Sequence, residues 1–458
     1  MKRMILSLLA AGALWAGILP SGAAPTESSP NVELVGGHRF AGGTDLDFRG
    51  DYAYVGSFEN ADGGLYIFDV GDPLNAKLVG RYLCPGYQDD VGVWRNTVVM
   101  GMHDAQERAG CTTRDTGGLR LVDVTDPTKP VETAFVTIEP FGTHTVTIVG
   151  DTGYVYANPG GLGTTADEQS TMIVDIRDAA KPTVVGEWLP PNSTGCHDIN
   201  VVGNRAYCAG SNVTYILDIT DPVHPQIISS ILNPLIFFHH GAVPSSDGDT
   251  LVIADEAFGA HVCDPLGANP TGAFWFYDIS DETSPQLLGW ISQTGFVATG
   301  GLLGPMNTRG DWCTAHNFNM VPGKDWMVAS SYTGGTSIID FTDPAAPSVI
   351  GWIIPENADT WSSYVYRGYI YTGDLNRGFD VIAMDELVAQ AAAGPPGAPG
   401  ANRPGTVVKG TKNTKSRSGT RGAALPGTGV GAPAASWILL GAASGIALTL
   451  RRDRPRRS

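Results

Sequence analysis

Apolar and polar residues alternate along most of this chain in short runs that recur as one unit. Each unit starts with two alternating segments joined by a Gly-Asp or Gly-Asn turn, as in residues 46–57 and 199–210. Such alternation places successive side chains on opposite faces of a strand, and the turn residues predict an antiparallel hairpin. A third apolar run ends in aspartate, and an Asp-Pro turn leads into a fourth run such as residues 76–82. The pattern predicts four antiparallel strands per unit.

The third strand and its turn are the most regular part of the unit. Copies lie at residues 65–73, 119–127, 171–179, 214–222, 274–282 and 336–344, with a degenerate copy at 378–386. Because the motif is constant while its spacing varies, we expect the length differences in loops. Repeated four-stranded units of this size are typical of β-propeller blades. Counting first strands predicts seven blades, which begin near Thr44, Asp89, His144, His197, His239, His316 and Trp361.

The two ends of the repeat array predict how the ring closes. The last unit has no fourth strand, whereas residues 32–36, ahead of the first blade, match the fourth-strand pattern. We therefore expect the N-terminal strand to complete the last blade, which would leave no open sheet edge. Residues 384–393, just past the ring, are the best helix candidate. An open β-solenoid or two β-sandwiches are the alternative arrangements of the same strands.

The repeated segments LYIFD, LRLVD, MIVD, YILD, FWFYD and SIID resemble the LVIVD repeat family of bacterial surface and secreted β-propellers. The resemblance covers residues 32–386. It implies an all-β, seven-bladed β-propeller of four-stranded blades. It implies no particular activity, because propellers carry many unrelated functions.

Both ends of the chain predict export. Residues 1–24 combine two basic residues, an apolar run and small residues, which is the pattern of a secretory signal. Residues 425–458 place an LPGTG motif before an apolar segment at 432–450 and an arginine-rich tail. The apolar segment is long enough to cross a bilayer, and the arginines favour the cytoplasmic side. A permanent transmembrane anchor is the alternative reading of this end.

The three-part C-terminal pattern resembles the Gram-positive cell-wall sorting signal. The resemblance implies recognition by sortase of Leu425, Pro426, Thr428 and Gly429, cleavage between Thr428 and Gly429, and attachment of Thr428 to peptidoglycan. Residues 391–424 are rich in Pro, Gly, Ser and Thr and predict a disordered stalk between the propeller, residues 25–390, and the anchor. We therefore expect a protein secreted and anchored to the cell wall, with the membrane contacted only through the sorting segment.

The charge and the cysteine content indicate which partners to exclude and whether disulfides form. The formal net charge is −17, and the stalk and both termini are basic, so the acidic excess lies in residues 25–390. A ring this acidic is not expected to bind nucleic acid. Six cysteines in an exported chain favour disulfides. The expected face of each loop favours the pairs Cys84–Cys111, Cys196–Cys208 and Cys263–Cys313.

Histidines recur at one position of the repeat. The blade alignment places His144, His197, His239 and His316 at the start of first strands, where they would meet at one mouth of the central channel. His240 is adjacent, Asp89 holds the same place in blade two, and His103, Asp255 and Glu256 end second strands on that face. Neutral imidazoles with carboxylates can hold Zn, Cu, Mn or Fe. The alternative is that the histidines bond to neighbouring blades and only support the fold.

Two functions fit these observations. The first is a wall-anchored propeller that binds an extracellular glycan, protein or small ligand. The second is an extracellular metal-dependent enzyme, a hydrolase or an oxidase, that uses the histidine ring. The sequence contains no GxSxG, HExxH or phosphate-loop motif, which disfavours nucleophilic serine hydrolysis and nucleotide use.

Overall fold

The computed structural model describes residues 26–58, 63–84, 86–103, 117–138, 142–159, 170–191, 195–257, 270–292 and 313–392. The chain divides into two units, Met1–Gly410 and Thr411–Ser458, and the described residues all belong to the first. The signal segment, the sorting motif and the apolar segment 432–450 lie outside the described residues. Within the described part, no helix has the length and apolar character needed to cross a membrane.

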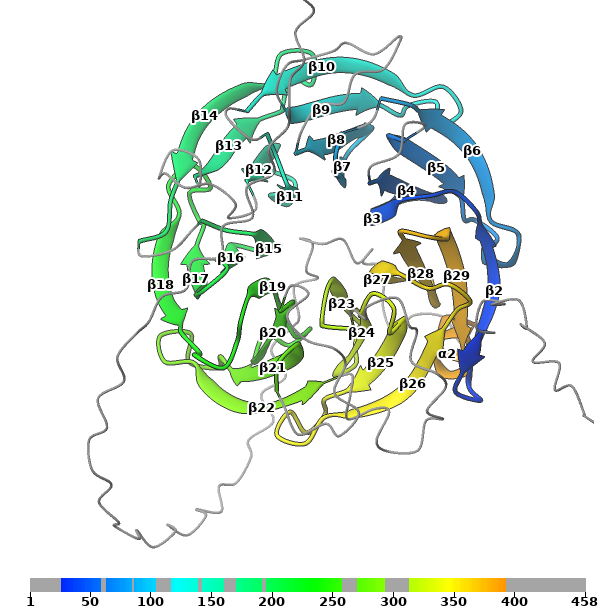
Figure 1. Ribbon diagram of the computed structural model, residues 1–458. Helices are drawn as coiled ribbons and strands as arrows, with labels where there is room; N and C mark the ends of the chain where they lie inside the picture. Colours follow the sequence, from blue (N-terminus) through cyan, green and yellow to red (C-terminus); the bar gives the residue numbers. More distant parts are fainter. Residues whose placement is uncertain are drawn as a thin grey trace, which may run out of the picture. The chain divides into compact units, whose positions relative to one another are not determined.

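Seven antiparallel sheets surround a central channel, and in the first five blades four consecutive strands run from the channel outward (Figure 1). Blade one contains β3 (Gly43–Arg49), β4 (Tyr52–Ser57), β5 (Leu65–Asp69) and β6 (Lys77–Tyr82). Blade two contains β7 (Asp89–Trp94), β8 (Thr97–Met102), β9 (Gly118–Asp123) and β10 (Val131–Thr137). Blade three contains β11 (Thr145–Ile148), β12 (Tyr154–Asn158), β13 (Thr171–Asp175) and β14 (Thr183–Trp188).

The remaining blades follow the same plan, which confirms the predicted seven-bladed propeller. Blade four contains β15 (Asp198–Val202), β16 (Arg205–Ala209), β17 (Thr214–Asp218) and β18 (Gln226–Ile231). Blade five contains β19 (His239–Pro244), β20 (Thr250–Asp255), β21 (Ala273–Asp278) and β22 (Gln286–Ser292). Blade six contains β23 (Phe318–Met320), β24 (Trp326–Ser330), β25 (Thr336–Asp340) and β26 (Ser348–Ile354). Blade seven contains β27 (Thr360–Tyr366), β28 (Tyr369–Asp374) and β29 (Gly378–Met384).

The N-terminal strand closes the ring as expected. Strand β2 (Val32–His38) pairs antiparallel with β29 and is the fourth strand of blade seven. Strand β1 (Glu27–Ser28) adds a fifth strand to blade six, which the sequence did not predict. Two short helices complete the described elements, η1 (Pro73–Asn75) and α2 (Asp385–Ala392), and α2 lies where the helix was expected.

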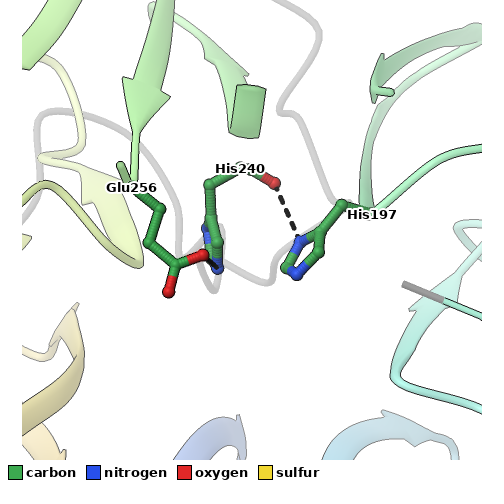
Figure 2. Close-up of side chains that lie close together, drawn as sticks. All are labelled: His197, His240 and Glu256. Atoms are coloured by element: carbon green, nitrogen blue, oxygen red, sulfur yellow. Dashed lines mark hydrogen bonds and ion pairs between the residues drawn. The ribbon is translucent and has the colours of Figure 1, made fainter. Parts of the chain in front are cut away.

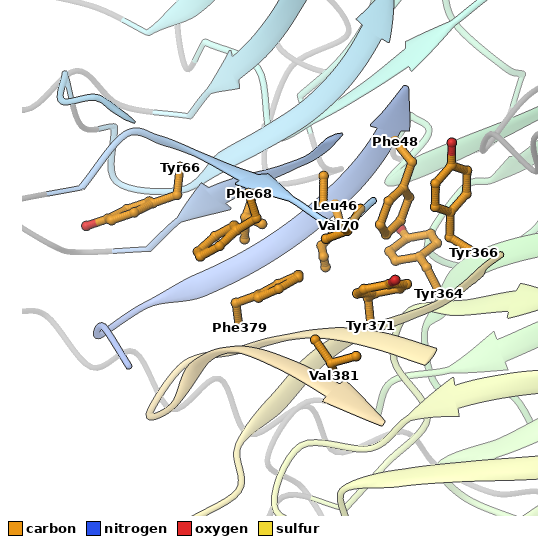
Figure 3. Packing of buried hydrophobic residues seen from close by; sticks show 12 residues of the cluster. Leu46, Phe48, Tyr66, Phe68, Val70, Tyr364, Tyr366, Tyr371, Phe379 and Val381 are labelled. Atoms are coloured by element: carbon orange, nitrogen blue, oxygen red, sulfur yellow. The ribbon is translucent and has the colours of Figure 1, made fainter. Parts of the chain in front are cut away.

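Aromatic packing fills the seam where blade one meets blade seven (Figure 3). Phe68 of β5 stacks on Phe379 of β29 with ring centroids 4.2 Å apart, and Phe48 of β3 stacks on Tyr366 of β27 at 4.6 Å. Stacked rings contribute about 0.5–1.5 kcal/mol beyond the apolar area that they bury. The two ends of the blade array are therefore joined by side-chain packing as well as by β2.

The aspartates of the repeat shape turns. In blade two, Asp123 Oδ1 accepts a hydrogen bond of 2.8 Å from the Thr125 amide, and Asp126 Oδ1 accepts one of 3.0 Å from the Thr128 amide. The same pair of two-residue bonds recurs in the other copies of the motif, from Asp69 and Asp72 to Asp340 and Asp343. These are Asx turns, which side-chain oxygens of aspartate favour. The repeat motif is therefore structural.

Candidate metal centre at the channel mouth

The inner strands place two layers of side chains around one end of the channel. The outer layer, here called the mouth ring, takes one residue from each blade: Thr44, Asp89, His144, His197, His240, His316 and Trp361. Strand pairing sets this layer, because Asp198 faces Ala209 in blade four and Gly241 faces Ala254 in blade five. His197 and His240 precede Asp198 and Gly241 and so occupy the same place in their blades.

Four histidines of the mouth ring lie in one continuous row. Ring centroids are 4.6 Å apart for His144 and His197, 4.3 Å for His197 and His240, and 4.2 Å for His240 and His316. His103, which follows β8, extends the row, with its ring centroid 5.1 Å from that of His144. The blade symmetry thus brings together side chains that are far apart in sequence, as the sequence predicted.

Two histidines of this row and Glu256 lie close enough together to hold a metal ion. One ligand atom each from His197, His240 and Glu256 lies within 4.8 Å of the other two, and all three residues are buried (Figure 2). Glu256 follows β20 and its Oε2 is 3.7 Å from His240 Nε2. His144 Nε2 lies 3.0 Å from His197 Nε2. This is a hydrogen-bond distance, so one of these two nitrogens carries a proton and the other accepts it.

Backbone carbonyls of the next blade fix two of the imidazoles. His316 Nδ1 is 2.5 Å from the Trp361 carbonyl oxygen, and His197 Nδ1 is 3.3 Å from the His240 carbonyl oxygen. A carbonyl oxygen only accepts, so each Nδ1 carries the proton and each Nε2 has a lone pair. The lone pair of His197 Nε2 faces His144 Nε2, 3.0 Å away, whereas His316 Nε2 faces Glu256. Metal-ligating histidines commonly use their second nitrogen in this way. At His316 one nitrogen therefore supports the fold while the other can serve a ligand, and at His197 an ion would replace the contact with His144.

Two buried atoms of the cluster have no hydrogen-bond partner, Glu256 Oε2 and His240 Nδ1. Glu256 is 3% exposed, and its other oxygen accepts a hydrogen bond from the Tyr332 hydroxyl. A buried polar atom without a partner costs free energy, and a bound ion is one way to satisfy it. The donor set and the unpartnered carboxylate oxygen therefore fit a metal ion.

Burial keeps the histidines neutral. Desolvation lowers the pKa of His197 to about 4 and of His316 to about 3, and it holds the pKa of His144 and His240 well below the usual range. Desolvation also raises the pKa of Glu256 to about 8. A cation beside Glu256 would stabilise its ionised form and would bind the neutral imidazoles without displacing a proton from them.

Three of the sequence candidates, His239, Asp255 and Asp89, have their side chains engaged within the fold. His239 is not a mouth-ring residue: it pairs with Asp255 outside a bulge, and its Nδ1 lies 2.8 Å from Thr214 Oγ1. The Asp255 carboxylate accepts hydrogen bonds from the amides of Phe237, Phe238 and Gly272, so it holds loops.

Asp89 lines the mouth ring, yet its carboxylate is already used within the fold. It accepts hydrogen bonds from the Gly86 amide and the Ser57 hydroxyl at 2.9 and 3.2 Å. Three other candidates remain in the cluster with the distances given above: His144, His197 and His316. The candidates His240, His103 and Glu256 lie in the same cluster.

Tyr332 is a site residue that the sequence analysis missed. Its ring lies 4.6 Å from that of His316, and its hydroxyl donates to Glu256. Its φ is 48°, and Ser211 and Ala257 have similar positive values just after second strands. A bulky residue with positive φ is an outlier that often marks a functional position. The position carries no sequence signal of its own, because the equivalent residue is Phe58 in blade one and Ser211 in blade four.

The disulfide prediction is confirmed for one pair. Cys196 and Cys208 form a bond with an S–S distance of 2.05 Å, which links the segment before β15 to the end of β16. Cys84 and Cys313 are also disulfide-bonded. Their expected partners, Cys111 and Cys263, lie outside the described residues.

Comparison with known proteins identifies the fold. Residues 47–148 match the family described as a β-propeller domain, and residues 195–233 match the LVIVD repeat. No curated protein matches the sequence. A solved structure from Lactobacillus plantarum is similar at a TM-score of 0.51 and 13% identity, over 70% of this chain and 88% of that chain. The periplasmic gluconolactonase of Pseudomonas aeruginosa is similar at a TM-score of 0.50 and 10% identity, over 68% and 86% of the two chains.

Likenesses at this identity show the fold alone. A β-propeller domain from Myceliophteria thermophila is equally similar, at a TM-score of 0.51 and 11% identity over 76% of this chain and 99% of that chain. Propellers with different names are thus matched alike, which agrees with the use of one fold for many functions. The chain is a seven-bladed β-propeller whose fourth blade, residues 195–233, carries an LVIVD repeat.

Proposed function

We propose that this protein is an extracellular metal-dependent β-propeller enzyme, with a divalent transition-metal ion at the channel mouth. The observation that carries the proposal is the convergence of His197, His240 and Glu256, whose ligand atoms lie within 4.8 Å of one another. Two imidazoles and one carboxylate are a ligand set of catalytic zinc sites and of non-haem iron sites. Among Zn, Cu, Mn and Fe, this set best suits Zn²⁺ or Fe²⁺.

The neighbouring residues support hydrolysis. A metal ion held by three protein ligands can polarise a substrate carbonyl or lower the pKa of a bound water. His316 Nε2 lies 4.0 Å from Glu256 Oε1, and as a neutral imidazole protonated at Nδ1 it can accept a hydrogen bond from a bound water or a substrate hydroxyl. Tyr332 holds Glu256 through its hydroxyl. Burial of these side chains excludes bulk water and strengthens each electrostatic contact.

A second candidate function is a binding propeller for an extracellular glycan, protein or small ligand. The connection between β18 and β19 exposes Leu232 to 73%, and Leu235 and Phe237 to 59% each. It leads directly into the strand that carries His240, and Phe238 in the same connection has its ring 4.9 Å from that of His197. Exposed apolar patches commonly mark interaction sites. A protein without metal at the mouth ring would favour this second function.

Export and anchoring belong to the same proposal. The LPGTG motif, the apolar segment and the basic tail occur in the order of a sorting signal, which supports processing by sortase and attachment to peptidoglycan. Location of the chain in the cell-wall fraction, covalently bound through Thr428, is the measurement that checks this. A Thr428→Ala chain that still reached peptidoglycan would rule the sorting signal out.

Substitution of the proposed ligands tests the metal site. His197→Ala combined with His240→Ala should reduce the metal content of the purified protein to background, because two of three ligands are removed. His239→Ala is the adjacent control, since its side chain turns to Thr214, and His224→Ala is an exposed control at an Asp-Pro turn. Both controls should retain the metal. Equal metal content in the double variant and the controls would contradict the proposed ligands.

A further inference from the structure

Two aspartates from neighbouring blades are in contact beside the channel. Asp45 lies on β3 of blade one and Asp90 on β7 of blade two, and a hydrogen bond joins their side chains. An ionised carboxylate can only accept a hydrogen bond, so one of these two carboxyls has to carry a proton and donate it. Two carboxyls that share a site hold on to one proton because their charges repel. The contact between Asp45 and Asp90 therefore requires one proton.

The other hydrogen bonds of the pair indicate which carboxyl holds this proton. Asp45 also accepts hydrogen bonds from the Tyr364 hydroxyl and from the Asn317 side chain. Asp90 Oδ2 accepts the amide of Val146 at 2.5 Å. Hydrogen bonds to a carboxylate favour its ionised form. Asp45 is therefore the acceptor of the pair, and Asp90 carries the proton and donates it.

The surroundings of the pair contain no base that could replace the proton. Asp45 and Asp90 line two cavities of about 60 and 10 Å³, and none of the described residues that line these cavities is a lysine or an arginine. Burial raises the pKa of both aspartates, and the charge of Asp45 raises the pKa of Asp90 further. The other titratable residues that line the two cavities are Asp47, Asp89, Asp198, Tyr364, His144, His197, His240 and His316.

The hydrogen bonds of the pair connect the inner strands of four consecutive blades. They run from Tyr364 on β27 of blade seven to Asp45 of blade one, across to Asp90 of blade two, and on to Val146 on β11 of blade three. Loss of the shared proton would break this connection between blades one and two. It would also place two negative charges in contact at a buried site, which is costly.

We propose that the proton shared by Asp45 and Asp90 is a pH-sensitive switch in the channel wall, which joins the inner strands of blades one and two at low pH and is lost as the pH rises. An aspartate in an unfolded chain releases its proton near about pH 4, whereas the folded pair retains one. The stability that the pair contributes is therefore complete below about pH 4. Above it, the folding equilibrium constant falls about tenfold per pH unit for one proton, until the pair ionises. The switch does not depend on an ion at the mouth ring.

Urea denaturation of the purified protein between about pH 5 and about pH 7 tests the switch. In Asp90→Asn, the side-chain NH₂ can donate to Asp45 without a titratable proton, and the amide oxygen can still accept the Val146 amide. We expect the folding equilibrium constant of wild type to fall about tenfold more per pH unit than that of Asp90→Asn. Asp45→Asn should also reduce the pH dependence, because either substitution removes the shared proton. Asp126→Asn is the control, since it makes the same change of charge at an exposed turn and should keep the wild-type pH dependence.

Infrared spectroscopy detects the proton directly. The difference spectrum of wild type minus Asp90→Asn at about pH 6 should contain the carbonyl stretch of one protonated carboxyl. Two results would overturn the switch: the same pH dependence in wild type and Asp90→Asn, or a difference spectrum without that carbonyl band. If Asp90→Asn does not fold, Asp45→Asn takes its place in both measurements, and the same two results decide.

Discussion

Individual side chains at the mouth ring serve the fold with one atom and the channel with another. His316 donates Nδ1–H to the Trp361 carbonyl oxygen and leaves Nε2 facing Glu256. The Glu256 carboxylate is divided in the same way: one oxygen accepts a hydrogen bond from the Tyr332 hydroxyl, and the other has no hydrogen-bond partner. The site is thereby preorganised by hydrogen bonds that hold its ligands in place.

Tyr332→Phe tests this positioning at the scale of one residue. The aromatic ring is retained while Glu256 loses its hydrogen-bond donor. We therefore expect the free energy of unfolding to fall by about 1–3 kcal/mol and the metal affinity to fall about 10–100-fold. Chemical denaturation and competitive metal titration measure the two effects. Tyr156→Phe is the control, because its hydroxyl donates to the Pro222 carbonyl at a turn far from the mouth. Equal metal affinity in the two variants would show that Tyr332 does not position Glu256.

The direction of individual side chains could not be predicted from the sequence. Aligning FFHHG with the other first strands selected His239, whereas strand pairing selects His240, because the register shifts by one residue between His239 and Gly241. Nothing in two adjacent histidines shows which one is the extra residue of a bulge. Asp255 was a candidate ligand because of its carboxylate, but that carboxylate accepts hydrogen bonds from loop amides. The types of side chain were therefore predictable, and their directions were not.

Strands, by contrast, were predicted well, because alternation and turn chemistry act locally. The Gly-Asp turn at residues 50–51 needs a positive φ, and Gly50 has a φ of 60° with no atom near its missing side chain. The aspartate turns recur because each oxygen binds an amide two residues later. Strand β1 was missed because two residues carry no periodicity.

Strand β2 gives the prediction at the scale of an element. Deleting residues 25–37 should remove several kcal/mol of stability, because β29 loses its partner and the buried side chain of Val32 is lost. Deleting only residues 25–30 removes β1 and leaves β2, so its effect should be much smaller. Thermal unfolding of the two truncations compares them. Equal midpoints would mean that β2 does not stabilise the ring.

At the scale of the whole propeller, ring closure brings side chains from several blades together at the channel mouth. Ring closure follows from the fourth-strand pattern at residues 32–36, and the aromatic seam between blades one and seven reinforces it. The ring brings His144, His197, His240 and His316 together although a hundred residues or more separate the first from the last. Blade symmetry made that cluster predictable, whereas the role of Tyr332 depended on a backbone conformation that only the structure shows.

Metal content of the purified wild-type protein tests the central claim most directly. We predict about one transition-metal ion per chain, Zn²⁺ or Fe²⁺, bound by His197, His240 and Glu256. Its removal by a chelator should lower the thermal midpoint, since a ligand that binds the folded state at 100 times its Kd contributes about 2.7 kcal/mol. Restoring the ion should restore the midpoint. Protein purified without a stoichiometric ion, whose midpoint does not respond to Zn, Cu, Mn or Fe, would contradict the metal centre.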